Sequence, residues 1–244
     1  MKQSTYKGQY GTILVIGGSD MYTGAPIFVT KAAFRSGAEM VYVMVPSNDY
    51  ATKIIKEVHE AIVTDLLFDL KILKKINACV IGPGLGRMTE NTLSTILKIV
   101  EFFDKNNIWT VLDADIIHYY KKGIFNNFSK IILTPNHNEN INLVVKSHHF
   151  CLLKGKADIL FMGNKQIKSL LVQNQCIKRC CGLGDMLCGI IAAHLCFSEE
   201  TIEKTIEKAS IIAKKAAYSG FVKKYYGIKV TDIIEEIPQF LGKN

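Results

Sequence analysis

The feature that most constrains the fold is an alternation of short β-branched segments with longer amphipathic segments. Strand-like runs occur at residues 12–16, 40–45, 78–81, 110–113, 131–133 and 151–154. Helices are predicted between them, most clearly at residues 26–36, 91–106, 184–197, 199–218 and 232–240, with Ser198 and Thr231 as N-caps of the last two. Strands that alternate with crossover helices pack as a mostly parallel sheet. The sequence therefore predicts an α/β fold.

The length allows one large domain, residues 1–244, because no linker, low-complexity tract or internal repeat divides the chain. The composition is 48% hydrophobic and 21% charged, as in globular proteins. The longest apolar stretch, residues 186–197, includes His194 and is far shorter than the roughly 20 residues of a membrane span, so we predict a buried core helix. Residues 1–11 are polar and do not resemble a signal peptide, so we expect a cytoplasmic protein without a membrane partner.

The cysteines indicate reduced thiols rather than a disulfide framework, since there are seven and none stands in a CxxC pair. A zinc site built from Cys176, Cys180, Cys181 and His194 would match no standard module. We predict that these cysteines are small buried apolar side chains.

The net charge of +8 is spread along the chain instead of forming one basic patch. Lysine pairs at residues 74–75, 121–122, 214–215 and 223–224 lie without interleaved aromatic residues that would stack on bases. We expect solvated helix faces and no nucleic-acid partner, although the positive balance suits small polyanions such as nucleotides.

Polar and glycine-rich turns follow four of the predicted strands, at residues 17–19, 82–86, 113–115 and 134–139. Ligands of open parallel α/β sheets bind outside the carboxyl ends of the strands. These four turns therefore predict one shared site.

Two of these turns are rich in glycine. Residues 16–26 follow a strand and open a helix but lack the G-x-G-x-x-G spacing, which disfavours a standard dinucleotide fold and leaves a tight turn or a ligand-facing role open. Residues 81–87 carry three glycines within five positions, which would leave N–H groups bare enough to approach a phosphate or a flat ring. A purely structural use is the alternative.

Asp185 begins the most apolar predicted helix, directly after Gly182 and Gly184. A carboxylate at a helix N-terminus can take a proton from a hydroxyl that attacks a bound phosphate, and an N-capping role is equally open. The helix dipole should keep Asp185 ionised and only weakly basic.

Eight segments in order carry a resemblance that spans residues 7–237: K7-G-Q-Y-G11, Y22-T-G-A-P26, G82-P-G-L-G-R87, L112-D-A-D115, L133-T-P-N-H-N-E139, K154-G-K-A-D158, K178-R-C-C-G-L-G-D185 and T231-D-I-I-E-E-I237. The chain resembles the ATP-dependent (S)-NAD(P)H-hydrate dehydratases, in particular their eukaryotic branch. This resemblance implies a ribokinase-like three-layer α/β/α sandwich with a mostly parallel central sheet.

The resemblance also implies a reaction. ATP phosphorylates the ring hydroxyl of hydrated NADH or hydrated NADPH, with Asp185 as the base, and loss of phosphate restores the reduced cofactor and leaves ADP. Mg²⁺ is the expected cofactor, and an epimerase that acts on NAD(P)H hydrate is the implied partner. Both hydrates stay open as substrates.

By the same resemblance, the hydrate is bound by Tyr22, Gly24, Gly82, Gly84, Gly86, Asn136, His137, Asn138, Glu139, Asn140, Ile141, Asn142 and Asp185. ATP is bound by Lys154, Gly155, Lys156, Ala157, Asp158, Gln175, Cys176, Ile177, Lys178, Arg179, Cys180, Cys181, Gly182, Leu183 and Gly184, with the N–H groups of the last three as an anion hole. No metal ligand is assigned. Asp113 and Asp115 could position substrate or metal, or cap the next helix, and residues 136–139 could be a plain polar turn.

Two departures from the family pattern bear on these expectations. The family loop reads C-G-G-Q-G-D, whereas this chain reads C180-C-G-L-G-D185, so Cys181 would be strained if the replaced glycine had a positive φ. The segment between Glu139 and Lys154 is also short, which predicts a trimmed pocket wall.

Two alternative functions stay open on the sequence. One is a kinase for a small hydroxymethyl compound, and the other is a nucleotide-binding relative without turnover. The apolar positions of residues 202–218 would also allow a homo-oligomer to form through an exposed helix.

Overall fold

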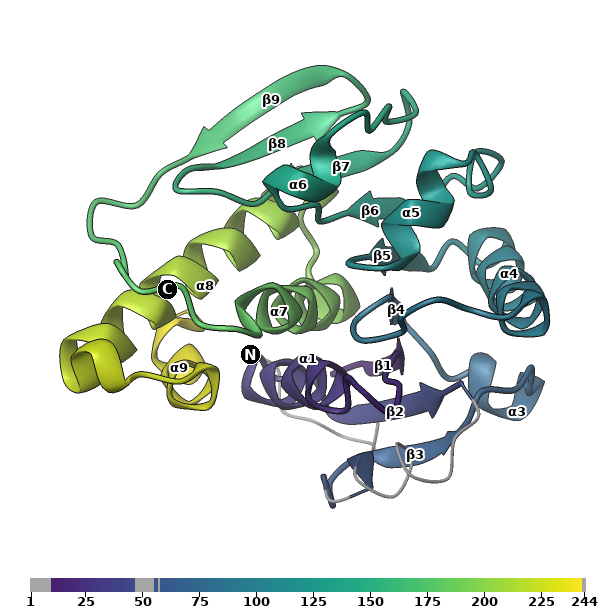
Figure 1. Ribbon diagram of the computed structural model, residues 1–244, viewed down its shortest axis with the longest axis horizontal. Coiled ribbons are helices and arrows are strands. Elements are labelled where there is room, and N and C mark those ends of the chain that lie inside the picture. Colours follow the sequence, from purple (N-terminus) through teal and green to yellow (C-terminus); the bar gives the residue numbers. More distant parts are fainter. Residues whose placement is uncertain (1–9, 47–54, 57, 243–244) are drawn as a thin grey trace.

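The central element is one sheet of nine strands (Figure 1). In the computed structural model, which describes residues 10–46, 55–56 and 58–242, the strand order is β3-β2-β1-β4-β5-β6-β7-β8-β9. The bounds are β1 Thr12–Ile16, β2 Met40–Val45, β3 Ile62–Asp65, β4 Ala78–Ile81, β5 Trp109–Leu112, β6 Ile131–Leu133, β7 Phe150–Leu153, β8 Asp158–Met162 and β9 Lys165–Leu170. The neighbours from β3 to β7 pair in parallel, and β8 and β9 join antiparallel. The prediction of a mostly parallel sheet is confirmed.

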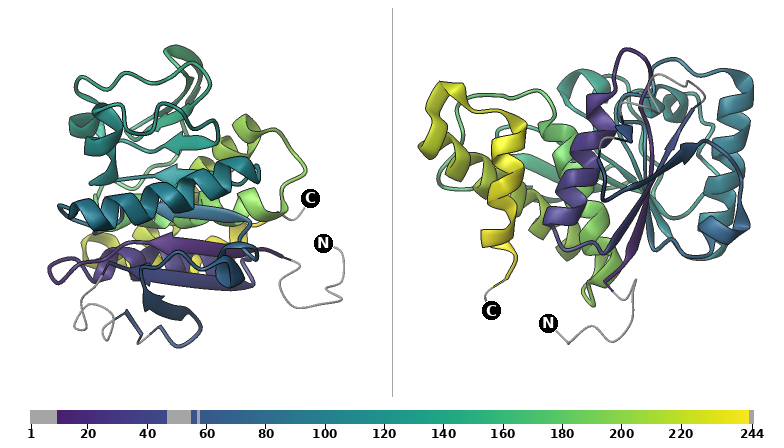
Figure 2. Two further views of the ribbon diagram at one scale, coloured as in Figure 1. Left: turned by 90° about the vertical axis from the view of Figure 1, so that its right-hand side faces the viewer. Right: turned by 90° about the horizontal axis from the view of Figure 1, so that it is seen from below.

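Helices cover both faces of this sheet, as Figure 2 shows. One face carries α1 (Gly24–Arg35), α7 (Leu183–Phe197), α8 (Ile202–Lys224) and α9 (Val230–Glu236), and the other carries α3 (Leu70–Leu73), α4 (Glu90–Lys105) and α5 (Ile116–Lys121). Successive strand residues serve opposite faces, so Ile13 and Val15 pack under α1 and α7 whereas Leu14 and Ile16 pack under α4. The three layers are those of a ribokinase-like α/β fold.

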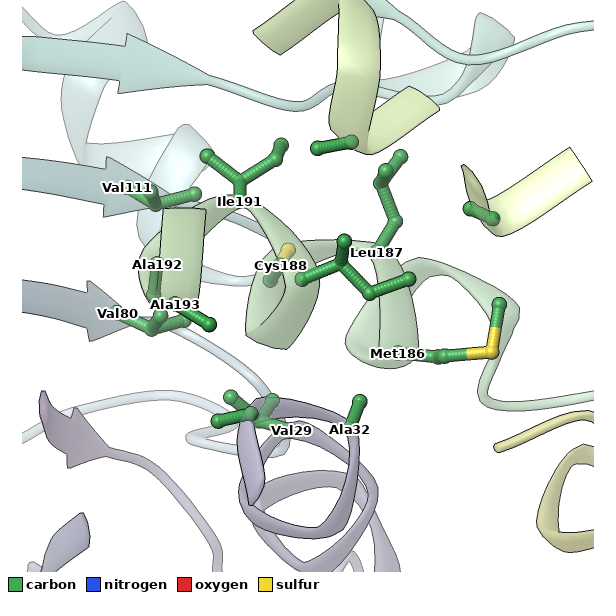
Figure 3. Packing of buried hydrophobic residues seen from close by; sticks show 14 of the residues in the cluster. Val29, Ala32, Val80, Val111, Met186, Leu187, Cys188, Ile191, Ala192 and Ala193 are labelled. Carbon is green, nitrogen blue, oxygen red and sulfur yellow. The ribbon is translucent and has the colours of Figure 1, made fainter. Parts of the chain in front are cut away.

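Helix α7 is the central helix of its layer and sets where the residues at its N-terminus lie. Its residues from Met186 to His194 are all buried, and its side chains face α1, β4 and β5 (Figure 3). At Gly189 a Cβ would fall 2.3 Å from the carbonyl oxygen of Val29, so glycine is what lets α7 approach α1 this closely. The apolar stretch is therefore a core helix, as predicted, and no described helix has both the length and the apolar character to cross a membrane.

Several predicted helix boundaries are wrong. Ser198 is the C-cap of α7, and the N-cap of α8 is Thr201, whose side chain accepts from the Lys204 N–H. Thr231 lies inside α9, which begins after Lys229. The predicted last helix also stops at Glu236 and continues as a 3₁₀ turn, Ile237–Phe240.

Three strands and three short helices were not predicted. Strand β9 has five exposed residues out of six and two lysines, so it shows no apolar alternation, and β3 is an edge strand of four residues. Helices α3, α5 and α6 (His137–Asn140) have between four and six residues each, too few for a helical period to show.

The apolar face of α8 is not exposed, which corrects the expected oligomerisation helix. Its apolar side packs on α7 and α9 within the same chain and buries Ile206, Ala209, Ile212, Ala213, Ala216 and Ala217. Lys214 of this helix also departs from the expected solvated face, because its ammonium pairs with the buried Asp158 at 2.9 Å. The motif at residues 7–11 falls outside the described residues except for its last two positions.

Candidate active site

Four loops meet at one edge of the sheet because β1, β4, β5 and β6 are adjacent and parallel. The loop after β1 lies directly on the loop after β4. The Gly18 N–H donates to the Pro83 carbonyl at 2.9 Å, and a Cβ on Gly17 would fall 2.3 Å from that same oxygen. The prediction that these turns converge is confirmed.

The loop after β4 is fixed by glycines with positive φ. At Gly82 (φ 123°) a Cβ would fall 1.7 Å from the Asp113 carbonyl oxygen, and at Gly84 (φ 71°) it would fall 2.5 Å from the Tyr22 carbonyl oxygen. Gly86 (φ 64°) is different, because a Cβ there meets nothing nearer than 3.9 Å. Gly82 and Gly84 are therefore required by close backbone contacts, and Tyr22 is brought against the loop as expected.

This loop offers fewer free donors than its sequence suggests. The N–H groups of Gly82, Leu85 and Gly86 donate to the carbonyls of Ile16 and Gly82 and to the Asp115 carboxylate, the last at 3.0 Å. The expectation of several bare N–H groups is therefore wrong. Residues 82–85 are buried against the rest of the protein, and only Gly86 and Arg87 at the end of the motif are more exposed.

The carboxylates of the two aspartates after β5 both have partners in the structure, and neither caps a helix. Asp113 is buried, accepts from Thr134 Oγ1 at 2.9 Å and pairs with Lys154 Nζ at 2.7 Å. Asp115 occupies the N-cap position of α5, but its side chain binds Gly86 instead of the helix. Ala114 between them has a positive φ of 56°, a backbone conformation that concentrates at functional sites.

Lys154 joins this aspartate to the first turn of α7. A Cβ on Gly184 would lie 2.9 Å from Lys154 Nζ and 3.6 Å from Asp113 Oδ2, so only glycine at that position leaves room for the ion pair. Burial opposes the ammonium charge, but the Asp113 carboxylate outweighs it and raises the pKa of Lys154.

After β6, residues 136–139 form a capping box at the start of α6. Asn136 Oδ1 accepts from the N–H groups of Asn138 and Glu139, and Glu139 Oε2 accepts from the Asn136 N–H at 2.8 Å. The polar turn thus has a structural role, while His137 is exposed. Burial, and then the negative charges of Asp113 and Asp115, raise the pKa of Glu139.

Asp185 is the third residue of α7, and the N-cap is Gly182 (φ 92°), so the capping alternative for Asp185 is wrong. Its side chain is half-buried, and within the described part of the chain no hydrogen bond or ion pair occupies its carboxylate. Burial is the main cause that raises the pKa of Asp185 to about 7, and the charges of Asp113 and Glu139 add to it against the opposing charge of Lys154. The expectation of a weakly basic carboxylate is corrected, because burial and like charges outweigh the helix dipole.

The segment of residues 175–184 wraps toward α7 and is held by side chains that reach carbonyl groups. Gln175 Nε2 donates to the Lys156 carbonyl at 3.2 Å, Lys178 Nζ donates to the carbonyls of Tyr226 and Ile228, and Cys180 Sγ contacts the Ile228 carbonyl. Cys181 does not have a positive φ, so it carries no backbone strain. Its side chain is exposed, which corrects the expected burial, and Cys176 and Cys180 are only partly buried.

Within residues 154–158, Asp158 has a supporting role. Its carboxylate accepts from the Gly155 N–H at 2.9 Å and from Ser210 Oγ at 2.7 Å, and it is almost fully buried. Lys214 completes the support by donating to the Gly155 carbonyl. Asp158 therefore fixes the loop that Lys154 begins.

A cavity of about 280 Å³ opens beside these loops, lined by Arg87, Ala114, Asp115, Ile117, His118, Lys121 and Glu139. It touches the loop after β4 through Arg87 and the capping box through Glu139. Asp185 does not line it, but its carboxylate feels the charge of Glu139. A wider groove of about 660 Å³ lies between α4 and residues 124–128.

The structure thus groups most of the predicted residues, and it adds some that the sequence did not single out. Thr134 supports Asp113, and Arg87, His118 and Lys121 line the cavity. Arg87 stands at the end of the glycine motif, and this position was the only sequence signal that could have pointed to any of these residues. His118 and Lys121 carry none, because a polar pair three residues apart on a short helix is common.

Comparison with known proteins matches almost the whole chain to one family. Residues 13–239 fit the family model described as NAD(P)H-hydrate dehydratase. The ATP-dependent (S)-NAD(P)H-hydrate dehydratase of Ciona intestinalis is 30% identical over 282 residues, which cover 98% of this chain and 76% of that protein. The protein of the same name from Entamoeba histolytica is 30% identical over 277 residues, covering 98% and 91%.

Solved structures share the fold. An ADP/ATP-dependent NAD(P)H-hydrate dehydratase from Bacillus subtilis, co-crystallised with ATP and Mg²⁺, superposes with a TM-score of 0.76 at 19% identity, covering 98% of this chain and 92% of that one. A ribokinase-like superfamily protein from Enterococcus faecalis gives a TM-score of 0.77 at 25% identity, covering 99% and 90%.

Proposed function

This chain belongs to the NAD(P)H-hydrate dehydratase family, and from this membership we propose that it catalyses the ATP-dependent dehydration of the S epimer of hydrated NADH or NADPH. The products are the reduced cofactor, ADP and phosphate. The enzyme is a carbon–oxygen lyase that repairs a damaged nucleotide.

The chemistry requires a base, because the ring hydroxyl of the hydrate is a poor leaving group. Its oxygen attacks the γ-phosphate of ATP, its proton passes to a carboxylate, and ADP leaves. The lone pair of the neighbouring ring nitrogen then expels phosphate and forms an iminium, and loss of a proton from the adjacent ring carbon restores the ring double bond. Phosphoryl transfer of this kind depends mainly on positioning and on stabilisation of charge.

We assign the base to Asp185, and one observation carries this assignment. Within the described residues its carboxylate is half-buried and has no partner, whereas Asp113, Asp115 and Glu139 each accept hydrogen bonds. A pKa of about 7 leaves roughly half of the carboxylates able to accept a proton near neutral pH, where a general base is most effective.

The N-terminus of α7 supplies the donors for the phosphate. Gly182, Leu183 and Gly184 lie at the start of a helix of 15 residues, and the first N–H groups of a helix have no intrahelical acceptor. Lys154 adds a fixed positive charge next to Gly184. These groups form the proposed anion hole, and the side-chain changes at Cys181 and Leu183 leave it in place.

We propose Mg²⁺ as the cofactor that accompanies ATP. No group of three or more His, Cys, Asp or Glu side chains in the described ranges forms a metal site. Mg²⁺ commonly takes only one or two carboxylates and binds substrate phosphates besides, so it needs no such group of side chains. When bound, it would neutralise charge that develops on the phosphates.

The other site assignments rest on the grouping of the loops. We propose that the glycine loop of residues 82–86 and the segment 136–142 contact the hydrate, and that residues 154–158 and 175–184 contact ATP. Tyr22 and Gly24 would shape the ring end of the pocket. We further propose that residues 1–244 act as one domain, and the seven unpaired thiols fit the cytoplasm.

The test is turnover of the purified protein with ATP, Mg²⁺ and hydrated NADH, followed by NADH absorbance and by ADP release. We expect one ADP for each NADH formed, and Asp185→Asn should lose at least 100-fold in kcat while it still binds ATP. Asp69→Asn is the matched control, because Asp69 caps the distant α3 and Asn caps a helix equally well. A stable phosphate ester without NADH would instead indicate a simple kinase, and ATP binding without hydrate-dependent ADP release would indicate a relative without turnover.

A further inference from the structure

The cavity beside residues 82–87 has a polar lining that shares only Glu139 with the charged groups that act on Asp185. Its volume of about 280 Å³ is just below the roughly 300–1,000 Å³ of a site that encloses a whole drug-sized ligand. It therefore suits one part of a larger molecule. Two of its walls, the loop after β4 and the capping box of α6, are the segments proposed above to contact the hydrate.

Two positively charged side chains of this cavity have N–H donors that can bind an anion. Within the part of the chain that the structure describes, the Arg87 guanidinium has no hydrogen-bond or ion-pair partner, so its five N–H donors are free. Lys121 is held in place because its ammonium donates to the Ile141 carbonyl at 2.6 Å, which leaves its other protons free. Both lie on the exposed rim of the cavity.

His118 lines the same cavity. Partial desolvation, and then the charges of Arg87, Lys122 and Lys121, lower the pKa of His118. A bound phosphate would reverse the effect of these charges and would let the imidazole donate as well.

The carboxylates of the same cavity complement a sugar rather than a free anion. Asp115 accepts from the Gly86 N–H through Oδ2, and Glu139 accepts from the Asn136 N–H through Oε2, so each retains an oxygen that can accept from a hydroxyl. In dinucleotide sites an acidic side chain binds ribose hydroxyls and an arginine beside it accepts the 2′-phosphate. Cations and carboxylates side by side thus match a phosphorylated ribose.

We propose that Arg87, Lys121 and His118 form a subsite for a phosphate of the hydrated dinucleotide, with Asp115 and Glu139 on the adjoining ribose. The proposal rests on the proposed function, since it names the part of that substrate the cavity takes. Two sources of the phosphate share this chemistry, namely the 2′-phosphate of hydrated NADPH and the pyrophosphate that both hydrates contain.

The test compares four variants in two assays. Arg87→Gln and Lys121→Gln each remove one positive charge, and Arg87→Lys keeps the charge at position 87. Arg35→Gln is the matched control, because Arg35 lies in the last turn of α1, where it pairs with Glu235, and does not line the cavity. The first assay is KM for each hydrate at saturating ATP. The second is calorimetric binding of NADPH and of NADH without ATP, which needs no turnover.

We expect Arg87→Gln to weaken binding about 10-fold or more, as for the loss of a hydrogen bond to a charged group, with kcat little changed. Arg87→Lys should recover part of the loss, and Arg35→Gln should bind as the wild type does. A loss confined to NADPH and its hydrate identifies the 2′-phosphate, and an equal loss for both cofactors identifies the pyrophosphate.

Wild-type affinity for both cofactors in Arg87→Gln and Lys121→Gln would overturn the proposal, as would a loss confined to ATP. If the wild type turns over neither hydrate but binds NADPH in a manner that depends on Arg87, the proposed function fails and the phosphate subsite stands.

Discussion

Two loops of the proposed site are held in different ways. The β4 loop, residues 82–89, is fixed by backbone contacts so close that Gly82 and Gly84 admit no side chain. The α7 loop, residues 175–184, is fixed by side chains that reach the carbonyls of Lys156, Tyr226 and Ile228. In the proposed function, the β4 loop contacts the hydrate and the α7 loop contacts ATP.

This difference explains where the sequence departs from its family pattern. Both changes, Cys181 and Leu183, lie in or next to the turn that leads into α7, where the positive φ belongs to Gly182 and the backbone donors survive a change of side chain. At Gly82 and Gly84 of the β4 loop even one methyl group would collide with the backbone. The α7 loop therefore tolerates a change of side chain where these two positions of the β4 loop do not.

The largest effect is expected at Lys154, which joins the two regions. Lys154→Met should destabilise the protein by about 3–5 kcal/mol, because it leaves the buried Asp113 carboxylate without its partner. Urea unfolding at pH 7 measures this. The matched control is Lys105→Met, which removes an exposed i,i+4 pair and should cost less than about 1 kcal/mol. Equal effects would show that the ion pair does not hold the two regions together.

The next effect sharpens the contrast within the β4 loop. Gly82→Ala should cost about 3 kcal/mol or more, because the new Cβ would fall on the Asp113 carbonyl at a positive φ. Gly86→Ala should cost only about 1–2 kcal/mol, since its Cβ meets open space. Thermal unfolding of the two variants measures the difference. If Gly86→Ala proved as harmful as Gly82→Ala, close backbone contact would not be what fixes this loop.

Asp185→Asn should make the protein more stable at pH 8 by roughly 2–4 kcal/mol, because each unit of a raised pKa is worth about 1.4 kcal/mol and solvent screens part of it. Since the folded-state pKa of Asp185 is raised to about 7, the carboxyl binds its proton more tightly in the folded state, and its ionisation costs stability as the pH rises from about 4 through 7. The gain should therefore vanish at pH 4. Urea unfolding at both pH values checks this, with the exposed Glu101→Gln as control. If Asp185→Asn were less stable than the wild type at pH 8, ionised Asp185 would not destabilise the folded protein, and the raised pKa would be contradicted.

The smallest effect is expected at Cys181. Restoring the family residue with Cys181→Gly should change stability by less than about 1 kcal/mol and kcat by less than about twofold, because Cys181 has ordinary backbone angles. Gly182→Ala is the matched change one position later, where the Cβ would lie 2.6 Å from the Phe28 ring at φ 92°, and it should cost more. A large gain in kcat for Cys181→Gly would mean that this cysteine displaces the anion hole.

The sequence predicted the parts of this architecture that depend on local pattern. The buried strands β1, β2, β4 and β6 are short, mostly apolar runs that contain several β-branched residues, and the alternation of strands with helices predicted that the four turns meet at one edge. Strand β9 was missed because its exposed face breaks the apolar pattern. The N-cap of α8 was misplaced by three residues because several polar residues precede that helix, and the N-cap of α9 by two because Thr231 and Asp232, which resemble a helix start, lie inside its first turn.

The electrostatics of the site could not be predicted in the same way. The pKa of Asp185 depends on burial and on Asp113 and Glu139, which come from loops after two other strands. A helix N-terminus by itself predicts the opposite shift, and only the assembled fold shows which effect is larger. The use of the Gly86 N–H by Asp115 is another long-range contact that the glycine spacing does not reveal.

The central claim is that Asp185 is the base, and the pH dependence of hydrate turnover tests it most directly. With the enzyme saturated with Mg²⁺ and ATP, kcat/KM for the hydrate should fall as the pH is lowered through about 7, because Asp185 then carries a proton and cannot accept another. A kcat/KM that stays constant from pH 8 down to pH 5 would contradict the account.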